Sequence, residues 1–327
     1  MSEGANKSYH FNSNMRTNSS SKSTMSNNED RYLRALEIQE RKQAIIDEEL
    51  EKGRKPGNQT FMKDGIPNLL VITRGHPFER DQFFEMIDSL GFEWSHIEHP
   101  AAQDFFGIDK IKKYSAILFY DMPGLNFEAD PSNKEFFVEP PENFKRNFID
   151  RLSEGIGCVF LHHALAGWPK WDEYHEIIGG KFLYQPGNVR GVKSPDSGYR
   201  HFVKYNVSSS GDHPITKGIE KFEIEDELYL ANIFEDKINP ILRSDYIFKK
   251  DNFYSASNAL SGKMNSNENW NHEDGSNVVG WTKNYKKSAI TYLQFGDDAK
   301  SYGNKNVRNI IRRSINWVIN ETADLKK

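Results

Sequence analysis

The pattern of hydrophobic and polar residues along the chain changes at residue 67. From there, short apolar runs alternate with segments in which apolar residues recur every three or four positions, as in 83–90 before Gly91. Runs of this length are typical of strands that are buried in a parallel sheet. They occur at 68–73, 93–97, 114–120 and 156–161. The alternation predicts an α/β fold, doubly wound, with a mainly parallel sheet and helices on both faces.

The second half of the chain has a less regular pattern, which predicts an irregular, β-rich region. Residues 199–207 alternate like a strand, 222–230 hold an acidic run, and 277–285 with 288–295 predict a hairpin. The polar, Asn-rich stretch 252–275 predicts a mobile loop. A helix is expected to close the chain, with a buried stripe of Val307, Ile310, Ile311, Ile315, Trp317 and Val318.

These patterns divide the chain into three zones. Residues 1–28 are rich in Ser and Asn and predict a disordered tail, because they offer little apolar surface to bury. Residues 29–66 predict a charged helix over 29–54 followed by a linker. Residues 67–322 form the expected α/β domain.

Composition narrows the function. A net charge of −4 and a pI near 6.2 argue against a nucleic-acid-binding surface. We expect no membrane span, because no run reaches about 18 apolar residues. The N-terminus has no apolar leader, so the expected compartment is the cytoplasm. Cys158 is the single cysteine, which excludes an internal disulfide and any zinc site that needs two thiolates.

The strongest motif is the stretch from Gly155 to Trp171, in which an apolar strand runs into His162 and His163. A turn of small residues follows, with Pro169 as the expected first residue of a helix. In an extended strand the two histidines would point to opposite faces, so one of them is the better candidate for catalysis. A hydrogen-bonded pair that stabilises the turn is the alternative. The turn holds no Ser or Cys nucleophile, which disfavours acyl transfer.

Polar residues also follow the other strands of the expected sheet. His76 comes after the first strand, and Asp121 ends the third. Because parallel strands place their carboxyl ends at one edge, His76, Asp121 and His163 could form an acid–base set. The same residue types could instead hold a divalent metal ion, and the sequence leaves its presence open. A loop histidine and a turn-forming aspartate are the alternatives.

Two further groups of residues are candidates for the site. The rings of Trp168 and Trp171 could stack on a sugar, although core packing is the more common role of such residues. The run from Glu225 to Tyr229 gathers carboxylates that can shift one another's pKa, with a solvated acidic turn as the alternative.

Together these residues resemble the ThuA (trehalose utilisation) family of the class I glutamine amidotransferase-like superfamily. The matches, in chain order, are Gly155 to Ala164 with Trp168 and Trp171, Gly179-Gly180, Asp212 to Gly218 with His213, Asp226 to Tyr229, and Val279 to Trp281 leading to Gly296. The chain departs from the family pattern at Lys286 to Ser288, where a Gly-rich turn is frequent, and at Asp297, where the family often has His.

The resemblance implies a flavodoxin-like fold without the amidotransferase nucleophile and a role in carbohydrate metabolism, often beside a sugar dehydrogenase that makes 3-keto sugars. It makes His163, His76, Asp121 and Glu227 the expected catalytic residues. The expected substrate-binding residues are His162, Trp168, Trp171, His213 and Tyr229.

Three hypotheses follow from the sequence. The first is an enzyme that acts on a sugar, keto-sugar or glycoside by His/carboxylate acid–base or metal-assisted chemistry. The second is a non-catalytic carbohydrate-binding or assembly protein. The third, an amidotransferase-type hydrolase, would need a reactive Cys158. The expected partners are a small sugar and a sugar dehydrogenase of the same pathway, with no nucleic acid and no membrane; the oligomeric state stays open.

Overall fold

The computed structural model describes residues 68–327. The expected tail at 1–28 and the charged helix and linker at 29–66 lie outside the described residues. Within residues 68–327 no helix is long and apolar enough to cross a membrane.

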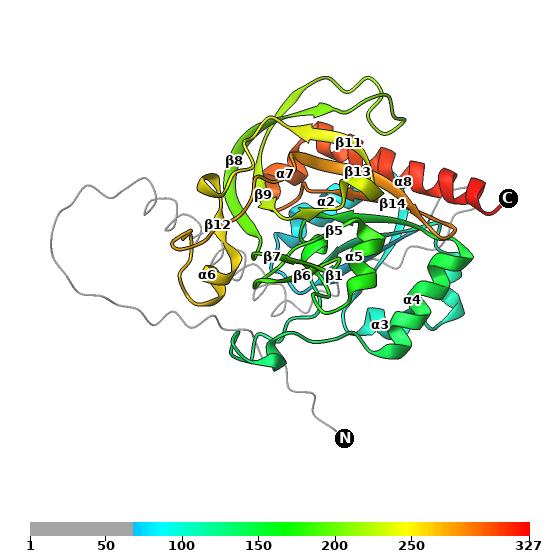
Figure 1. The fold of residues 1–327 in the computed structure, drawn as a ribbon. Helices are drawn as coiled ribbons and strands as arrows, with labels where there is room; N and C mark the ends of the chain where they lie inside the picture. Colours follow the sequence, from blue (N-terminus) through cyan, green and yellow to red (C-terminus); the bar gives the residue numbers. More distant parts are fainter. Residues whose placement is uncertain (1–67) are drawn as a thin grey trace.

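A ten-stranded sheet forms the centre of the fold (Figure 1). Its parallel part has the order β2-β1-β3-β4-β14, which is the 2-1-3-4-5 order of flavodoxin-like sheets. These strands are β1 (Asn68–Arg74), β2 (Glu93–Glu98), β3 (Ala116–Asp121), β4 (Gly157–Leu161) and β14 (Ser288–Leu293). The predicted doubly wound, mainly parallel sheet is therefore confirmed.

Helices cover both faces of this sheet (Figure 1). One face packs against α2 (Arg80–Ser89), α7 (Ala299–Gly303) and α8 (Lys305–Leu325), and the other against α3 (Ala101–Phe105), α4 (Glu142–Glu154) and α5 (Asp172–Ile178). Strands β1, β3 and β4 are buried on both sides, which explains their continuous apolar runs. The predicted C-terminal helix is confirmed as α8.

The second half extends the sheet with antiparallel strands in the order β14-β13-β11-β8-β12, and β9 pairs with β8. The predicted hairpin is confirmed as β13 (Val278–Tyr285) and β14. The strand expected at 199–207 is β8 (Gly198–Ser209), and the acidic run at 222–230 is a strand, β9 (Phe222–Leu230). The sheet is completed by β11 (Asn239–Ser244) and β12 (Tyr254–Ser255).

The stretch 252–275, expected as a loop, contains structure of its own. It includes β12 and helix α6 (Ala256–Leu260). It is also fastened to the body, because Trp270 is buried and its indole N–H donates to the Asp196 carbonyl at 3.1 Å. This anchored aromatic ring corrects the expectation of a mobile loop.

The remaining elements are short. They are β5 (Gly180–Lys181), β6 (Gly187–Val189), β7 (Val192–Ser194), β10 (Asn232–Ile233), and the 3-10 turns η1 (Asp109–Lys113), η2 (Lys134–Phe136), η3 (His162–Ala166), η4 (Glu235–Lys237) and η5 (Lys250–Asn252).

Candidate functional site

His162 occupies the turn directly after β4, at the carboxyl edge of the parallel strands. Its φ of 46° lies in the left-handed region, which is the strained strand-to-turn geometry of a nucleophile elbow. The chain then continues through η3, and α5 begins at Asp172 rather than at the expected Pro169. The elbow-like turn that the sequence predicted therefore presents an imidazole instead of a hydroxyl or thiol.

The His162 ring is buried and held at both nitrogens. Its Nδ1 donates to the carbonyl oxygen of Gln294 at 2.8 Å, because β4 and β14 run parallel and end side by side. Its Nε2 lies 3.0 Å from Glu227 Oε2 and 2.9 Å from the Tyr229 hydroxyl. Three residues named from the sequence, His162, Glu227 and Tyr229, thus meet in one place.

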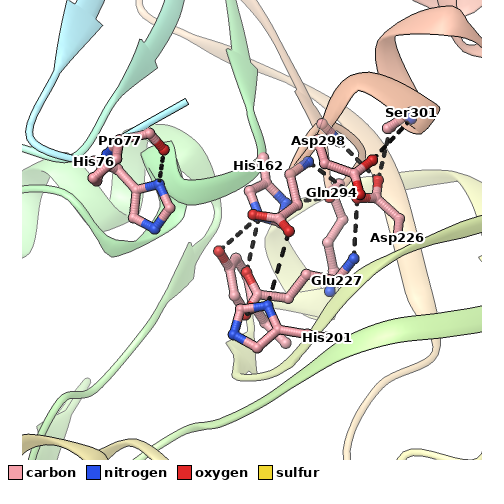
Figure 2. A network of polar contacts seen from close by, with 12 residues as sticks. His76, Pro77, His162, His201, Asp226, Glu227, Gln294, Asp298 and Ser301 are labelled. Carbon is pink, nitrogen blue, oxygen red and sulfur yellow. Dashed lines mark hydrogen bonds and ion pairs between the residues drawn. The ribbon is translucent and has the colours of Figure 1, made fainter. Parts of the chain in front are cut away.

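His201 of β8 faces the same carboxylate from the other side (Figure 2). Its Nδ1 lies 3.1 Å from Glu227 Oε1, and 26% of its side chain is exposed. Glu227 therefore joins a buried imidazole to one that reaches solvent. This carboxylate between two histidines is the centre of the candidate site.

A β-bulge in β8 produces this position of His201. Arg200 pairs with Leu228 and Val203 pairs with Asp226, so two residues of β8, His201 and Phe202, lie opposite Glu227 alone. Phe202 has a φ of 56°, a strained value for an aromatic residue. Bulges of this kind redirect a side chain next to a functional site.

Asp297 supplies a second carboxylate to the two histidines. Its Oδ1 lies 3.8 Å from His162 Nε2, and its Oδ2 lies 3.8 Å from His201 Nδ1. One ligand atom each from His162, Glu227 and Asp297 can be chosen so that all lie within 4.8 Å of one another. These three side chains are buried and form a group with the donor types of a divalent metal site.

The carboxyl group of Asp226 accepts hydrogen bonds from the backbone on both sides of the cluster. Its Oδ2 accepts from the Gly296 N–H at 2.8 Å and the Ser301 hydroxyl at 2.8 Å, and its Oδ1 accepts from the N–H groups of Asp297 and Glu227, both at 3.0 Å (Figure 2). Four donors converge on one buried carboxyl group. Asp226 therefore fixes the turn that carries Asp297 to the strand that carries Glu227.

The buried charges change one another's proton affinity. Burial alone lowers the pKa of His162, but the hydrogen bond and charge of Glu227, with Asp226 and Asp297, outweigh it and raise this pKa to about 9. Burial favours protonation of Glu227, yet the charge of His201 and the hydrogen bond from His162 lower its pKa. Burial and the charge of Asp297 raise the pKa of Asp226 to about 7, while His162 opposes this shift. The cluster therefore keeps a carboxylate beside an imidazolium at neutral pH.

His76 and His163 lie together next to this cluster. Their rings stack with centroids 4.7 Å apart, and His163 also contacts the rings of Tyr120 at 4.3 Å and His162 at 5.5 Å. His76 Nδ1 donates to the Pro77 carbonyl at 2.8 Å, which leaves Nε2 as its basic nitrogen (Figure 2). The structure thus brings together two of the three strand-end residues that the sequence selected.

Asp121, the third of them, is turned toward His99. Consecutive strand residues point to opposite faces, and Tyr120 packs against His163 while Asp121 leaves β3 on the other face. Its Oδ2 lies 2.7 Å from His99 Nε2, and burial raises the pKa of the Asp121 carboxyl despite this bond. A catalytic role of Asp121 stays a prediction, and it would act through a histidine that the sequence did not single out.

Trp168 and Trp171 belong to the buried core. The Trp168 ring contacts His99 and Phe144, and the Trp171 ring contacts Phe148 and Tyr174. Because aromatic neighbours surround both rings, we assign them to core packing rather than to the expected sugar platform.

His213 lies at the far end of the β8–β9 hairpin from the cluster. It is in the connection before β9, where its ring packs against Trp317 of α8 at 5.2 Å. Glu227 is five residues into β9, or about 16 Å along an extended strand at about 3.3 Å per residue. His213 is therefore separated from the cluster, and its expected contact with the substrate stays a prediction.

Three residues of the cluster, His201, Asp226 and Asp297, were not selected from the sequence. Asp226 stands directly before Glu227 in the acidic run, and this adjacency is a signal for Asp226 in the sequence. His201 gave no signal, because regular alternation in β8 does not reveal a bulge. Asp297 follows Gly296 at a position where the family often has His, and aspartate is itself a common metal ligand.

Cys158 lies in the middle of β4 and is fully buried. Burial raises the pKa of its thiol, which suppresses the reactive thiolate. Its place in the strand and its pKa both disfavour the third hypothesis, a cysteine-dependent hydrolase.

Comparison with known proteins supports the family reading of the sequence. The ThuA family model, described as trehalose utilisation, matches residues 68–318. No curated protein matches the chain.

One solved structure supports the fold, and a second gives a lower score. A ThuA-like protein from Parabacteroides merdae superposes with a TM-score of 0.55 at 14% identity, covering 78% of this chain and 90% of that one. A ThuA-like protein from Bacteroides uniformis gives a TM-score of 0.49 at 15% identity, covering 81% and 95%. At these identities the likeness to the first protein supports the fold alone.

Proposed function

The chain belongs to the ThuA (trehalose utilisation) family, and from this premise we propose that it is an enzyme that transforms a sugar or keto-sugar by proton transfer. Membership of the family gives the chain a role in sugar metabolism. The proposal adds the chemistry and the residues that carry it out.

The observation that carries the proposal is the Glu227 carboxylate between His162 and His201. A carboxylate that pairs with one ring nitrogen of a histidine orients the ring and stabilises its protonated form. Here Glu227 lies 3.1 Å from His201 Nδ1, and the second ring nitrogen of His201 points away from the carboxylate (Figure 2). His201 is therefore the general acid or base of the proposal, and Glu227 orients it.

His76 and His163 are the second group of the proposed site. Their stacked rings stand beside His162, at the strand edge where doubly wound sheets bind ligands. His76 is half-buried and can exchange protons with a bound molecule. Asp121 supports this edge through His99. Two histidine groups on one edge provide both an acid and a base, as isomerisation, β-elimination and glycoside cleavage require.

A keto-sugar is the substrate class that fits best. A carbonyl acidifies the neighbouring C–H bond, so a base of near-neutral pKa such as His can remove that proton. Removal of the proton leads to isomerisation or β-elimination, and the second route also cleaves keto-glycosides. The upstream reaction would be oxidation of a sugar hydroxyl by a sugar dehydrogenase.

The test is turnover of 3-keto-glucosides, including 3-keto-trehalose, by the purified full chain. His201→Asn and Glu227→Gln are expected to lower kcat by about 10²-fold or more, as loss of an acid–base group does. Glu225→Gln is the matched control, because it makes the same change two residues away on β9, where Glu225 pairs with Lys300 at the surface. The control is expected to keep full activity.

Two results would contradict the proposal. Equal turnover in His201→Asn, Glu227→Gln and the control would remove the proposed residues from the reaction. Saturable sugar binding without any product, unchanged by these substitutions, would instead support the non-catalytic carbohydrate-binding protein.

A further inference from the structure

The carboxylates of Glu227 and Asp297 each direct one oxygen toward one histidine of the cluster and the other oxygen toward the second histidine. Glu227 presents Oε2 to His162 and Oε1 to His201, and Asp297 presents Oδ1 to His162 and Oδ2 to His201. One oxygen of each carboxylate therefore lies on the His162 side. Together with His162 Nε2, these atoms make a nitrogen and two oxygens that face one point.

The orientation of His162 suits a metal ligand. Its Nδ1–H donates to the Gln294 carbonyl, so the ring directs Nε2 into the cluster, and loss of the Nε2 proton gives that nitrogen a lone pair for an ion. A metal-bound histidine usually donates a hydrogen bond of this kind, from the ring nitrogen that does not bind the metal to a backbone carbonyl or carboxylate. The buried proton on Nε2 and a metal ion would occupy the same position.

The distances also suit an ion. Bonds of about 2.1 Å from one ion place neighbouring ligand atoms roughly 3–4 Å apart. His162 Nε2 is 3.0 Å from Glu227 Oε2 and 3.8 Å from Asp297 Oδ1, and three such ligand atoms lie within 4.8 Å of one another.

The charge of the cluster favours a cation. Asp226, Glu227 and Asp297 are three buried carboxyl groups around His162, with 2%, 4% and 5% of their surfaces exposed. Buried carboxylates are stable when they are paired or bind metal ions. Asp226 accepts from four donors, whereas Glu227 Oε2 and Asp297 Oδ1 face His162 Nε2 at 3.0 and 3.8 Å.

We propose that His162, Glu227 and Asp297 bind a single divalent transition-metal ion, Zn²⁺ or Mn²⁺. The mixed nitrogen and oxygen donors disfavour Mg²⁺, which prefers oxygen ligands. Three protein ligands leave open positions, and the adjacent carbonyl and hydroxyl oxygens of a keto-sugar can occupy two of them. This role in substrate binding rests on the proposed function, whereas binding of the ion does not.

The test measures metal binding without substrate. The untagged full chain is stripped with a chelator and titrated with Zn²⁺, Mn²⁺ or Mg²⁺ by calorimetry, with metal content checked by mass spectrometry. One Zn²⁺ or Mn²⁺ per chain is expected, with weaker Mg²⁺ binding. Glu227→Gln and Asp297→Asn are expected to weaken binding about tenfold or more, since even supporting residues of metal sites have effects of about that size. Glu225→Gln should bind like the wild type.

Circular dichroism and thermal melts establish that the variants fold. If a variant does not fold, pulsed EPR of the Mn²⁺-loaded wild type decides, because an imidazole ligand couples its nitrogen to the ion. Absence of that coupling, absence of saturable binding, or equal affinity in Asp297→Asn and Glu225→Gln would each overturn the inference. Metal binding at this site without sugar turnover would leave the inference standing and defeat the proposed function; full turnover by metal-free protein that binds no ion would do the reverse.

Discussion

The buried histidine of α5, His175, makes the stability of the protein depend on pH. Burial and the charge of Lys181 lower the pKa of His175 to about 3. The imidazole is therefore neutral in the folded protein at any pH above about 3. In the unfolded chain the same group takes up a proton near pH 6.5. Between these pH values the unfolded state binds more protons, so stability falls as the pH falls.

The size of the effect follows from the two pKa values. Their difference is about 3.5, which corresponds to about 5 kcal/mol at about 1.4 kcal/mol per pKa unit. His175 thus makes its full contribution above about pH 6.5. Its contribution declines by about 1.4 kcal/mol for each pH unit below that value, until the folded-state pKa near 3 is reached.

The assay is urea unfolding of the wild type and His175→Gln from pH 7.5 to pH 4.5. Other groups titrate in both proteins, so the measured quantity is the difference between their free energies of unfolding at each pH. The wild type is expected to lose stability relative to the variant by about 2–3 kcal/mol over this range. His213→Gln, at a half-buried histidine whose pKa burial also lowers, should show a smaller difference. Parallel curves for the wild type and His175→Gln would refute the reasoning.

Three further predictions concern the fold around the site. Gly75→Ala places a Cβ 2.2 Å from a backbone carbonyl at a φ of +99°, so we expect a loss of at least about 2 kcal/mol in thermal or urea unfolding. Gly303→Ala meets nothing within 4 Å and should show no such loss. Asp226→Asn puts an amide N–H against backbone donors and should cost about 2–4 kcal/mol, against about 1 kcal/mol for Ser301→Ala; equal stabilities would contradict the four-donor arrangement. Cys158 should react with a thiol reagent only as fast as the protein unfolds, and rapid labelling of the folded chain would show that the thiol is accessible.

The parallel half of the fold could be predicted because burial of its strands on both faces produces a pattern that is visible in the sequence. Strands such as β1 and β3 are covered by helices on both faces, so their central positions form a continuous apolar run. The acidic run at 222–230 lacks such a continuous apolar pattern. It is a strand whose carboxylates point into the site or to surface partners, as Glu225 does toward Lys300, and such partners lie far away in the sequence.

Some residues of the site could be located from the sequence, but their arrangement in space could not. His162 could be located because it follows a clear strand, and Glu227 and Tyr229 because they belong to a dense motif. The sequence could not show that these residues meet, since this depends on the β8–β9 hairpin placing β9 beside the end of β4. For Trp168 and Trp171 the sequence could not separate two roles. An aromatic residue near a strand end has the same sequence pattern whether it faces a ligand or the core, and both of these residues are buried.

The β8 bulge explains why the sequence could not reveal His201, and it also shows how the site is built. Extending regular pairing from Val203 and Asp226 would put Phe202 opposite Glu227 and His201 opposite Leu228, a residue of the buried core. Since directly opposed residues share a face, His201 would then point away from the carboxylate. The extra residue, accommodated by the strained backbone of Phe202, turns His201 toward Glu227. The parallel half therefore supplies the buried His162, while the bulged antiparallel strand brings the solvent-reaching histidine to the same carboxylate, and neither half contains the pair alone.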